Sequence, residues 1–254
     1  MAGEASPHKR ARRATHQSPP RPYHSKGGRL KWLFYLVFHP HFARLLSSTH
    51  DEGCTGPSLH VRYNHASVRI KPSQDVAISL LLSGGIDSMV VLSLLRRGDR
   101  NITAVFIDYG QTAIAQERVA ARRIADHFAT RLVSLVLGLP NSFGPGEIPY
   151  RNGALIFAAA MATADTSDCI AVGVHAGVPY PDCSTQFLVS IDGALKASDP
   201  RPIQLIAPLK TWQKSEIIAY AKQERLPLEL TYSCEAGAVP PCGKCASCQD
   251  RVGL

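Results

Sequence analysis

The sequence contains no apolar run long enough to cross a lipid bilayer. A membrane-spanning helix needs about 20 consecutive apolar residues, whereas the best candidate, residues 32–38, reaches only seven before His39 and Pro40. A secretory signal is not indicated either. Such a signal places its apolar core soon after a short basic region, and here the polar residues 1–29 come first. We therefore expect a cytoplasmic protein with no membrane association.

Most of the chain also lacks the positive charge that nucleic-acid-binding proteins carry. The net charge is +8, and residues 1–75, with 12 Lys and Arg against 4 Asp and Glu, account for all of it. Residues 76–254 contain 16 of each kind and are neutral. A nucleic-acid-binding interpretation therefore applies only to the N-terminal segment.

The cysteines do not suggest a disulfide framework, because their number, seven, is odd and four of them lie within residues 234–248. Cys234, Cys242, Cys245 and Cys248 have the spacing C-x7-C-x2-C-x2-C. Four thiolates at this spacing match a closed tetrahedral zinc site. An iron–sulfur cluster is the alternative, and a redox dithiol would leave two of the four unexplained. We interpret the cluster as structural zinc, since four cysteine ligands leave no open coordination position.

Composition divides the chain into four parts. Residues 1–29, rich in Arg, Pro, Ser and His, are predicted to be a disordered basic tail. Residues 30–75 form an extension of uncertain structure, although alternating apolar and polar residues over 59–70 indicate a hairpin. Residues 76–233 are the predicted nucleotide-binding domain, and residues 234–254 are the zinc-binding element.

Apolar strands alternate with segments of helical spacing from residue 76 onward. We expect strands at 76–82, 102–108, 131–137 and 169–174, and helices at 89–96, 116–129, 154–164 and 213–223. In the second helix, Val119, Ile124 and Phe128 are available for a buried face. This alternation predicts an α/β fold, in which helices cover both faces of a parallel, Rossmann-like sheet.

The sequence Ser-Gly-Gly-Ile-Asp-Ser, residues 83–88, separates the first expected strand from the first helix. Ligands of open α/β sheets bind beyond the carboxyl ends of the strands. Glycines let the backbone come close to a ligand, and free amides at a helix start favour an anion. The loop is not a Walker loop, because no Gly-Lys-Ser/Thr follows, and its glycines do not have the G-x-G-x-x-G spacing either. It resembles the loop of the ATP pyrophosphatase (PP-loop) superfamily, which holds the pyrophosphate end of ATP.

We therefore predict nucleotide binding by this loop and by the end of the second strand. Asp87 has two open roles, since it could hold Mg²⁺ or orient the loop. The predicted nucleotide-binding residues are Leu82, Ser83, Gly84, Gly85, Ile86, Asp87, Ser88 and Asp108.

The loop and the cysteine cluster together resemble the 7-cyano-7-deazaguanine synthase (QueC) family. Further motifs of that family follow in order over residues 76–251: Asp-Tyr-Gly-Gln at 108–111 with Glu117 after it, Ile-Pro-Tyr-Arg-Asn at 148–152, Gly-Val-His-Ala-Gly at 173–177, Tyr-Pro-Asp-Cys at 180–183, Lys-Ser-Glu at 214–216, and Arg251. Each interior motif is weak alone, but the ordered set is specific.

The chain departs from the family around the expected substrate pocket. Thr112 and Ala113 replace an Arg-His pair, Ser184 replaces an arginine, and Gly-Val-Pro at 177–179 lacks the usual acidic residue. The stretch between 137 and 148 is short, and the sequence stops at Leu254, where relatives continue. These differences affect the expected substrate more than the expected use of ATP.

The resemblance implies a carbon–nitrogen ligase that forms AMP and pyrophosphate. ATP first activates the carboxylate of 7-carboxy-7-deazaguanine, ammonia displaces AMP to give an amide, and a second activation dehydrates the amide to the nitrile. The implied cofactors are ATP, Mg²⁺ and Zn²⁺, and the implied assembly is a homodimer. The implied catalytic residues are Asp87, Arg151 and Lys214. The implied substrate-binding residues are Arg151, Asn152, Tyr180 and Asp182.

Two alternatives remain open at this point. A QueC-like ligase could attach a deazaguanine to a protein partner in antiviral defence, and the N-terminal extension would then bind that partner. A zinc-containing nucleic-acid-binding module with an inactive ATP loop is the alternative of another class, although the intact loop argues against it. Residues 1–75 themselves could be a binding arm, an organelle transit peptide or a tail from an upstream start codon.

Overall fold

The computed structural model describes residues 61–63, 66–68, 76–98, 100–139, 143–144 and 146–252. The expected disordered tail at 1–29 and most of the extension at 30–75 lie outside these residues. Within the extension, β1 (Val61–Tyr63) pairs antiparallel with β2 (Ala66–Val68). The hairpin expected over residues 59–70 is thereby confirmed.

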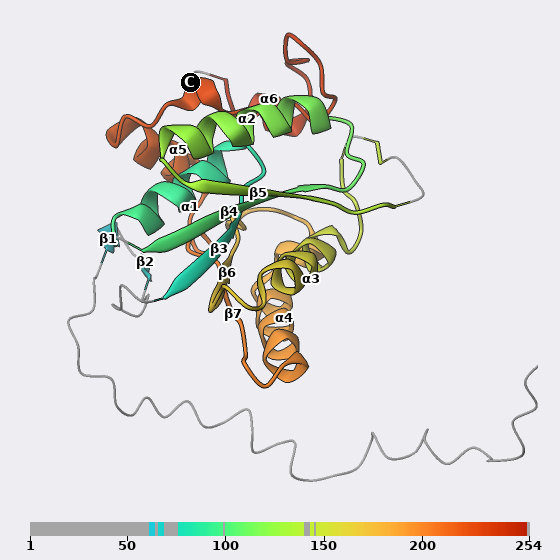
Figure 1. Ribbon diagram of the computed structural model, residues 1–254. Helices are drawn as coiled ribbons and strands as arrows, with labels where there is room; N and C mark the ends of the chain where they lie inside the picture. The colour runs from blue at the N-terminus through green and yellow to red at the C-terminus, as the bar shows by residue number, and fades with distance from the viewer. Residues whose placement is uncertain are drawn as a thin grey trace, which may run out of the picture. The chain divides into compact units, whose positions relative to one another are not determined.

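Five parallel strands form the main sheet, in the order β5-β4-β3-β6-β7. The chain runs from β3 outward to β4 and β5, then crosses to the other side of β3 to form β6 and β7 (Figure 1). The order reverses beside β3, and ligands bind at such a switch point in open α/β sheets. The strands are β3 (Ala77–Leu81), β4 (Asn101–Asp108), β5 (Arg131–Val136), β6 (Cys169–Ala171) and β7 (Gln204–Ile206).

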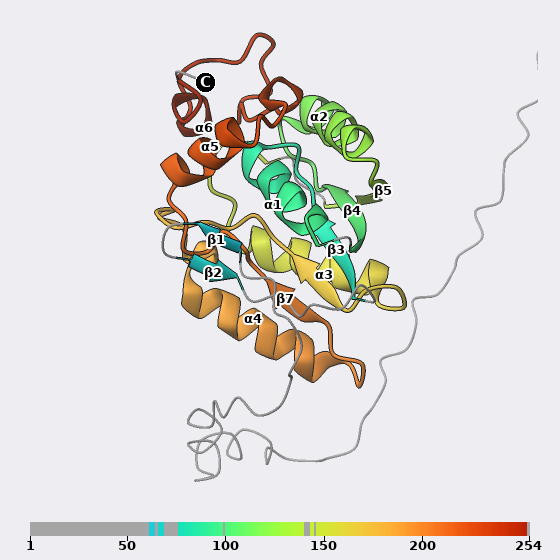
Figure 2. The ribbon, with the colours of Figure 1, turned by 90° about the vertical axis from the view of Figure 1, so that its left-hand side faces the viewer.

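Helices cover both faces of this sheet, as predicted (Figures 1 and 2). On one face lie α1 (Ile86–Arg96), α2 (Ile114–His127) and α5 (Lys214–Gln223), and on the other lie α3 (Arg151–Thr163) and α4 (Thr185–Ser198). Strand β4, which lies between β5 and β3, contributes to the cores on both faces, because its side chains alternate: Ala104 and Phe106 join the first core, and Val105 and Ile107 join the second.

Several elements and one buried face differ from the sequence predictions. Helix α4, strand β7 and the short helices at 181–183, 228–230 and 246–249 were not predicted. The assignment of Val119 to a buried face was wrong, because its side chain is 49% exposed. Small residues let α2 approach its neighbours closely instead, and the residues that it buries are Ala120, Ala121, Ile124 and Ala125.

The C-terminal segment folds back over the first loop of the sheet. It contains the short helices η3 (Leu228–Leu230) and α6 (Ala246–Gln249). Between them, the backbone N–H of Tyr232 donates to the carbonyl of Gly84 at 2.9 Å. This contact places the C-terminal element beside the carboxyl end of β3. In the part of the chain that the structure describes, no helix has both the length and the apolarity needed to cross a membrane.

Candidate active site

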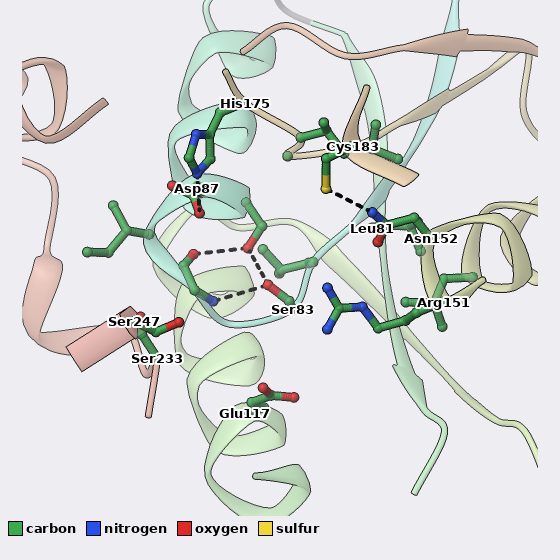
Figure 3. A pocket seen from close by; sticks show the side chains of 18 of the residues that line it. Leu81, Ser83, Asp87, Glu117, Arg151, Asn152, His175, Cys183, Ser233 and Ser247 are labelled. Carbon is green, nitrogen blue, oxygen red and sulfur yellow. Dashed lines mark hydrogen bonds and ion pairs between the residues drawn. The ribbon is translucent and has the colours of Figure 1, made fainter. Parts of the chain in front are cut away.

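The loop after β3 is held in shape by its own serines. Ser88 Oγ donates to the carbonyl of Gly85 at 3.0 Å, and the hydroxyls of Ser83 and Ser88 lie 3.3 Å apart (Figure 3). Gly84 has a φ of +88°, and a Cβ there would lie 2.7 Å from the backbone oxygen of Glu117. Only glycine therefore lets the loop pack this tightly on α2. The loop lies at the start of α1, where unpaired amides favour an anion.

Asp87, in the first turn of α1, is paired with Lys214 at the start of α5. Lys214 Nζ lies 2.7 Å from Asp87 Oδ1 and 2.9 Å from Oδ2. His175 Nδ1 is 2.7 Å from the carbonyl of Ala176, which can only accept, so Nδ1 carries the hydrogen. The opposite nitrogen of His175, Nε2, lies 3.9 Å from Asp87 Oδ2. The Asp87 carboxylate therefore holds the Lys214 ammonium group in place, and the imidazole ring of His175 is its second neighbour.

A second polar group lies where β4 ends and α2 begins. The side chain of Gln111 is buried and donates to Glu117 Oε2 at 3.0 Å and to the carbonyl of Ile107 at 3.2 Å. Burial raises the pKa of the Glu117 carboxyl, while the hydrogen bond from Gln111 and the charge of Arg151 oppose the rise. Burial likewise raises the pKa of Tyr109, again with Arg151 opposing. Arg151 is thus electrostatically coupled to both groups.

Residues 151–152 begin α3 and are fixed by the segment 181–183. The backbone N–H of Asn152 donates to Asp182 Oδ2 at 3.0 Å, and its side-chain amide donates to the Asp182 carbonyl at 3.0 Å. The same amide lies 3.3 Å from Cys183 Sγ. The Asp182 carboxylate therefore caps the first turn of α3, beside Arg151 in the chain.

Most of these groups line one cavity of about 340 Å³ at the carboxyl ends of β3, β4 and β6. Figure 3 shows Arg151 beside Ser83, with Glu117 near them and Asp87 and His175 together on another side of the loop. Ten of the sequence-predicted site residues line the cavity: Leu82, Ser83, Gly85, Ile86, Asp87, Ser88, Arg151, Asn152, Tyr180 and Lys214.

Three predicted residues do not line the cavity, and each has another contact. Gly84 packs against α2, and Asp182 caps α3. Asp108 accepts from Arg118 at 2.5 Å and from the N–H of Gly110 at 3.1 Å.

Several polar residues of the cavity were not assigned to the site from the sequence. Gln111, Glu117, His175 and Arg251 belong to the ordered family motifs, which was the signal that could have found them. Glu235 and Asp250 come from the C-terminal element, and only the folded chain brings them to the cavity. Asp250 Oδ2 lies 3.9 Å from Lys214 Nζ.

The four clustered cysteines converge, as their spacing predicts. Their Sγ atoms all lie within 4.8 Å of one another, and those of Cys242 and Cys248 are 3.9 Å apart. A tetrahedral site with Zn–S bonds of about 2.3 Å needs sulfur atoms about 3.8 Å apart. The backbone N–H of Lys244 donates to Cys242 Sγ and lowers the pKa of that thiol. The cluster therefore fits a zinc ion held by four thiolates.

Comparison with known proteins gives matches over most of the chain. A family model described as queuosine biosynthesis protein QueC matches residues 138–253, and the asparagine synthase model matches residues 65–139. The 7-cyano-7-deazaguanine synthase of Aquifex aeolicus is 32% identical over 68% of this chain and 94% of its own length. That of Prochlorococcus marinus strain MIT 9515 is 34% identical over 68% of this chain and 90% of its own.

Solved structures match less closely. The NMN synthetase of Francisella tularensis is 18% identical, with a TM-score of 0.46, over 63% of this chain and 66% of its own. Residues 1–64 lie outside both family models.

Proposed function

The chain belongs to the 7-cyano-7-deazaguanine synthase family of PP-loop, ATP-dependent ligases, and we propose that it converts 7-carboxy-7-deazaguanine and ammonia to the 7-cyano compound. One observation carries the proposal: a single cavity joins the phosphate-type loop at residues 83–88 to Lys214 and Arg151. These groups combine backbone donors with two cations, which is what adenylation of a carboxylate requires.

The loop and Lys214 are suited to the phosphate end of ATP. Hydroxyls of Ser83 and Ser88 and the amides at the start of α1 supply donors, and Lys214 adds a positive charge fixed by Asp87. When the substrate carboxylate attacks the α-phosphorus, negative charge builds on the phosphate oxygens and the leaving pyrophosphate. Preorganised donors stabilise such developing charge without reorganising. Mg²⁺ would find carboxylate donors in Asp87 and Asp250, the two acids beside Lys214.

Arg151, Asn152 and Tyr180 are suited to the deazaguanine. Arg151 can pair with the substrate carboxylate before it reacts, since a guanidinium matches a carboxylate in geometry and charge. Asp182 supports this arrangement by capping Asn152. Its engagement there favours a positioning role over direct reading of the base.

The four cysteines are suited to hold zinc, which would cross-link the C-terminal element when bound. That element contributes Glu235, Ser247 and Arg251 to the cavity wall, and Ser233 lines the wall just before it. Arg251 in turn donates to Thr231 Oγ1 at 2.6 Å and to the carbonyl of Leu228 at 3.3 Å. The zinc-binding residues therefore stabilise the C-terminal part of the cavity wall and take no part in the chemistry.

Incubation of the purified chain with 7-carboxy-7-deazaguanine, ammonium, Mg²⁺ and ATP tests the proposal. AMP, pyrophosphate and the nitrile are expected, and Asp87→Ala protein should form none of them. AMP together with a mass-shifted protein partner would indicate transfer of the deazaguanine to protein instead. Absence of AMP under every condition would contradict any ligase and leave the nucleic-acid-binding module.

A further inference from the structure

The proposed reaction needs a group that removes protons from nitrogen. Ammonia has three N–H bonds, the amide two and the nitrile none. In the first stage the C–N bond forms, the bond from carbon to the AMP oxygen breaks, and one N–H proton leaves. In the second stage the amide oxygen attacks ATP and displaces pyrophosphate. The C–O bond then breaks to release AMP, and two N–H protons leave. The amides and hydroxyls of the loop, together with Lys214 and Arg151, stabilise negative charge, so the proton acceptor has to be sought among the carboxylates and the histidine of the cavity.

Most carboxylates of the cavity are already engaged with cations or hydroxyls. Both oxygens of Asp87 contact Lys214, and Asp250 lies beside the same ammonium group. Glu235 Oε1 accepts from both the hydroxyl and the backbone N–H of Ser247. His175 faces Asp87 on the Lys214 side of the loop. Glu117 differs from the two aspartates, since its hydrogen-bond donor, Gln111, is an uncharged amide. It differs from Glu235 in its place on α2, next to the phosphate-type loop and under the charge of Arg151.

Glu117 is held firmly next to the phosphate-type loop. Gln111 fixes Oε2 and is itself fixed at both ends, by the carbonyl of Ile107 and by the backbone N–H of Tyr109 at 2.9 Å. The backbone of Glu117 packs against Gly84, where a Cβ would come within 2.7 Å. Glu117 thus lines the cavity from α2, together with Ser83 and Arg151, and the charge of Arg151 acts on its carboxylate (Figure 3).

We propose that the Glu117 carboxylate is the proton acceptor for the attacking ammonia and for the amide nitrogen of the second stage. This inference rests on the proposed function, because it assigns a role within that reaction. Arg151 would hold the acyl group on one side of Ser83, and the nitrogen would approach from the side of α2. A fixed carboxylate accepts a proton only if the nitrogen comes within hydrogen-bond reach, which the shared cavity allows.

The surroundings of Glu117 support this role. A carboxylate becomes a better base when burial raises its pKa toward the working pH. Burial raises the pKa of the Glu117 carboxyl in this way. Two facing groups lower that pKa in part, namely Gln111 through its hydrogen bond and Arg151 of α3 through its charge. The opposing effects keep the carboxylate ionised enough to accept a proton while leaving it more basic than an exposed glutamate.

The test separates activation of the substrate from attack by nitrogen. Glu117→Gln keeps an oxygen that can accept from Gln111 but removes the base, and Glu229→Gln, at an exposed position outside the cavity, is the matched control. Activation is measured as exchange of pyrophosphate into ATP that depends on 7-carboxy-7-deazaguanine. Trapping with hydroxylamine then reports the acyl adenylate, because hydroxylamine is mostly uncharged at neutral pH and needs less help from a base.

Glu117→Gln should retain exchange and hydroxamate formation, while the ammonia-dependent rate should fall about 100-fold or more. Glu117→Asp, which keeps a carboxylate, should recover part of that rate. An unchanged ammonia rate in Glu117→Gln would overturn the inference. So would a parallel loss of exchange, or a Glu117→Asp rate no higher than that of Glu117→Gln. A wild-type chain without exchange or hydroxamate would instead contradict the proposed function itself.

Discussion

Lys214 and Asp87 form an ion pair although 127 positions separate them in the chain. The pair joins the start of α5 to the start of α1, with Nζ–O distances of 2.7 and 2.9 Å. Since both helices begin at the carboxyl edge of the sheet, the ammonium group is held beside the amides of the phosphate-type loop. Asp87 therefore acts on the site at least partly through Lys214, which gives the loop the cation that no Walker lysine supplies.

Replacing Lys214 should impair activation of the substrate much more than folding. In Lys214→Met we expect pyrophosphate exchange to fall about 100- to 1000-fold, as it does when one preorganised donor is removed from a transition state. The thermal midpoint should change little, because both partners are partly exposed to water. Lys210→Met, at an exposed lysine outside the cavity, is the control. Equal exchange rates in the two variants would exclude a role for Lys214.

Gly84 should not tolerate even a methyl group. Gly84→Ala adds a Cβ 2.7 Å from the Glu117 carbonyl at a φ of +88°, and we expect it to destabilise the fold by about 2 kcal/mol or more. The matched variant is Gly193→Ala in α4, where a Cβ meets nothing within 4 Å, and it should stabilise by up to about 1 kcal/mol. Urea unfolding of both proteins measures the difference. A Gly84→Ala protein as stable as Gly193→Ala would contradict the described packing.

The sequence was informative wherever local chemistry determines the structure. Strand 76–82, the Gly-Gly loop and the cysteine spacing each specify their own geometry, and the structure has all three. Helix α4 and strand β7 were missed because their residues pack against a distant part of the chain, with Leu188 and Leu205 in the core beneath α3. Val119 was misassigned for a related reason: the alanines of α2, not its larger residues, make the close contacts.

The site itself was predictable only in part. Residues of the phosphate-type loop are contiguous, so one motif identifies them. The roles of Asp182 and Asp108 depend on neighbours 30 and 10 positions away, Asn152 and Arg118, which no local pattern reveals. The C-terminal residues reach the cavity because Tyr232 bonds to Gly84, a contact set by the fold as a whole.

Removing the metal should disturb the nucleotide site as well as the cysteine cluster. We expect one zinc per chain, lost in Cys245→Ser but retained in Cys54→Ser, whose position is remote in sequence. The segment from Cys234 to Cys248 is tied to Gly84 through Tyr232 and to Lys214 through Asp250. Hydrogen exchange of residues 83–88 should therefore quicken in Cys245→Ser. Zinc analysis near zero in the wild type, or unchanged exchange in the variant, would count against this coupling.

The pH dependence of stability offers a check on the surroundings of Glu117. Burial raises its pKa in the folded protein above the ordinary value of 4.5, so folding favours the protonated carboxyl. That stabilisation is complete below the unfolded pKa and is lost as the pH rises through the folded pKa. At pH 8 the wild type carries a buried charge that Glu117→Gln lacks. The variant should therefore melt at a higher temperature at pH 8, and its advantage should shrink as the pH falls through the folded pKa and be lost below 4.5.

Differential scanning calorimetry at several pH values measures this difference, with Glu229→Gln as the control for removing one negative charge at an exposed position. The control should show no comparable gain at pH 8, because its carboxylate is not transferred out of water on folding. The opposite result would be a Glu117→Gln protein that melts below the wild type at pH 8 but not at low pH. It would mean that Gln111 and Arg151 lower the pKa of Glu117 more than burial raises it. The carboxylate would then be a weaker base than an exposed glutamate, and a proton acceptor would have to be sought elsewhere in the cavity.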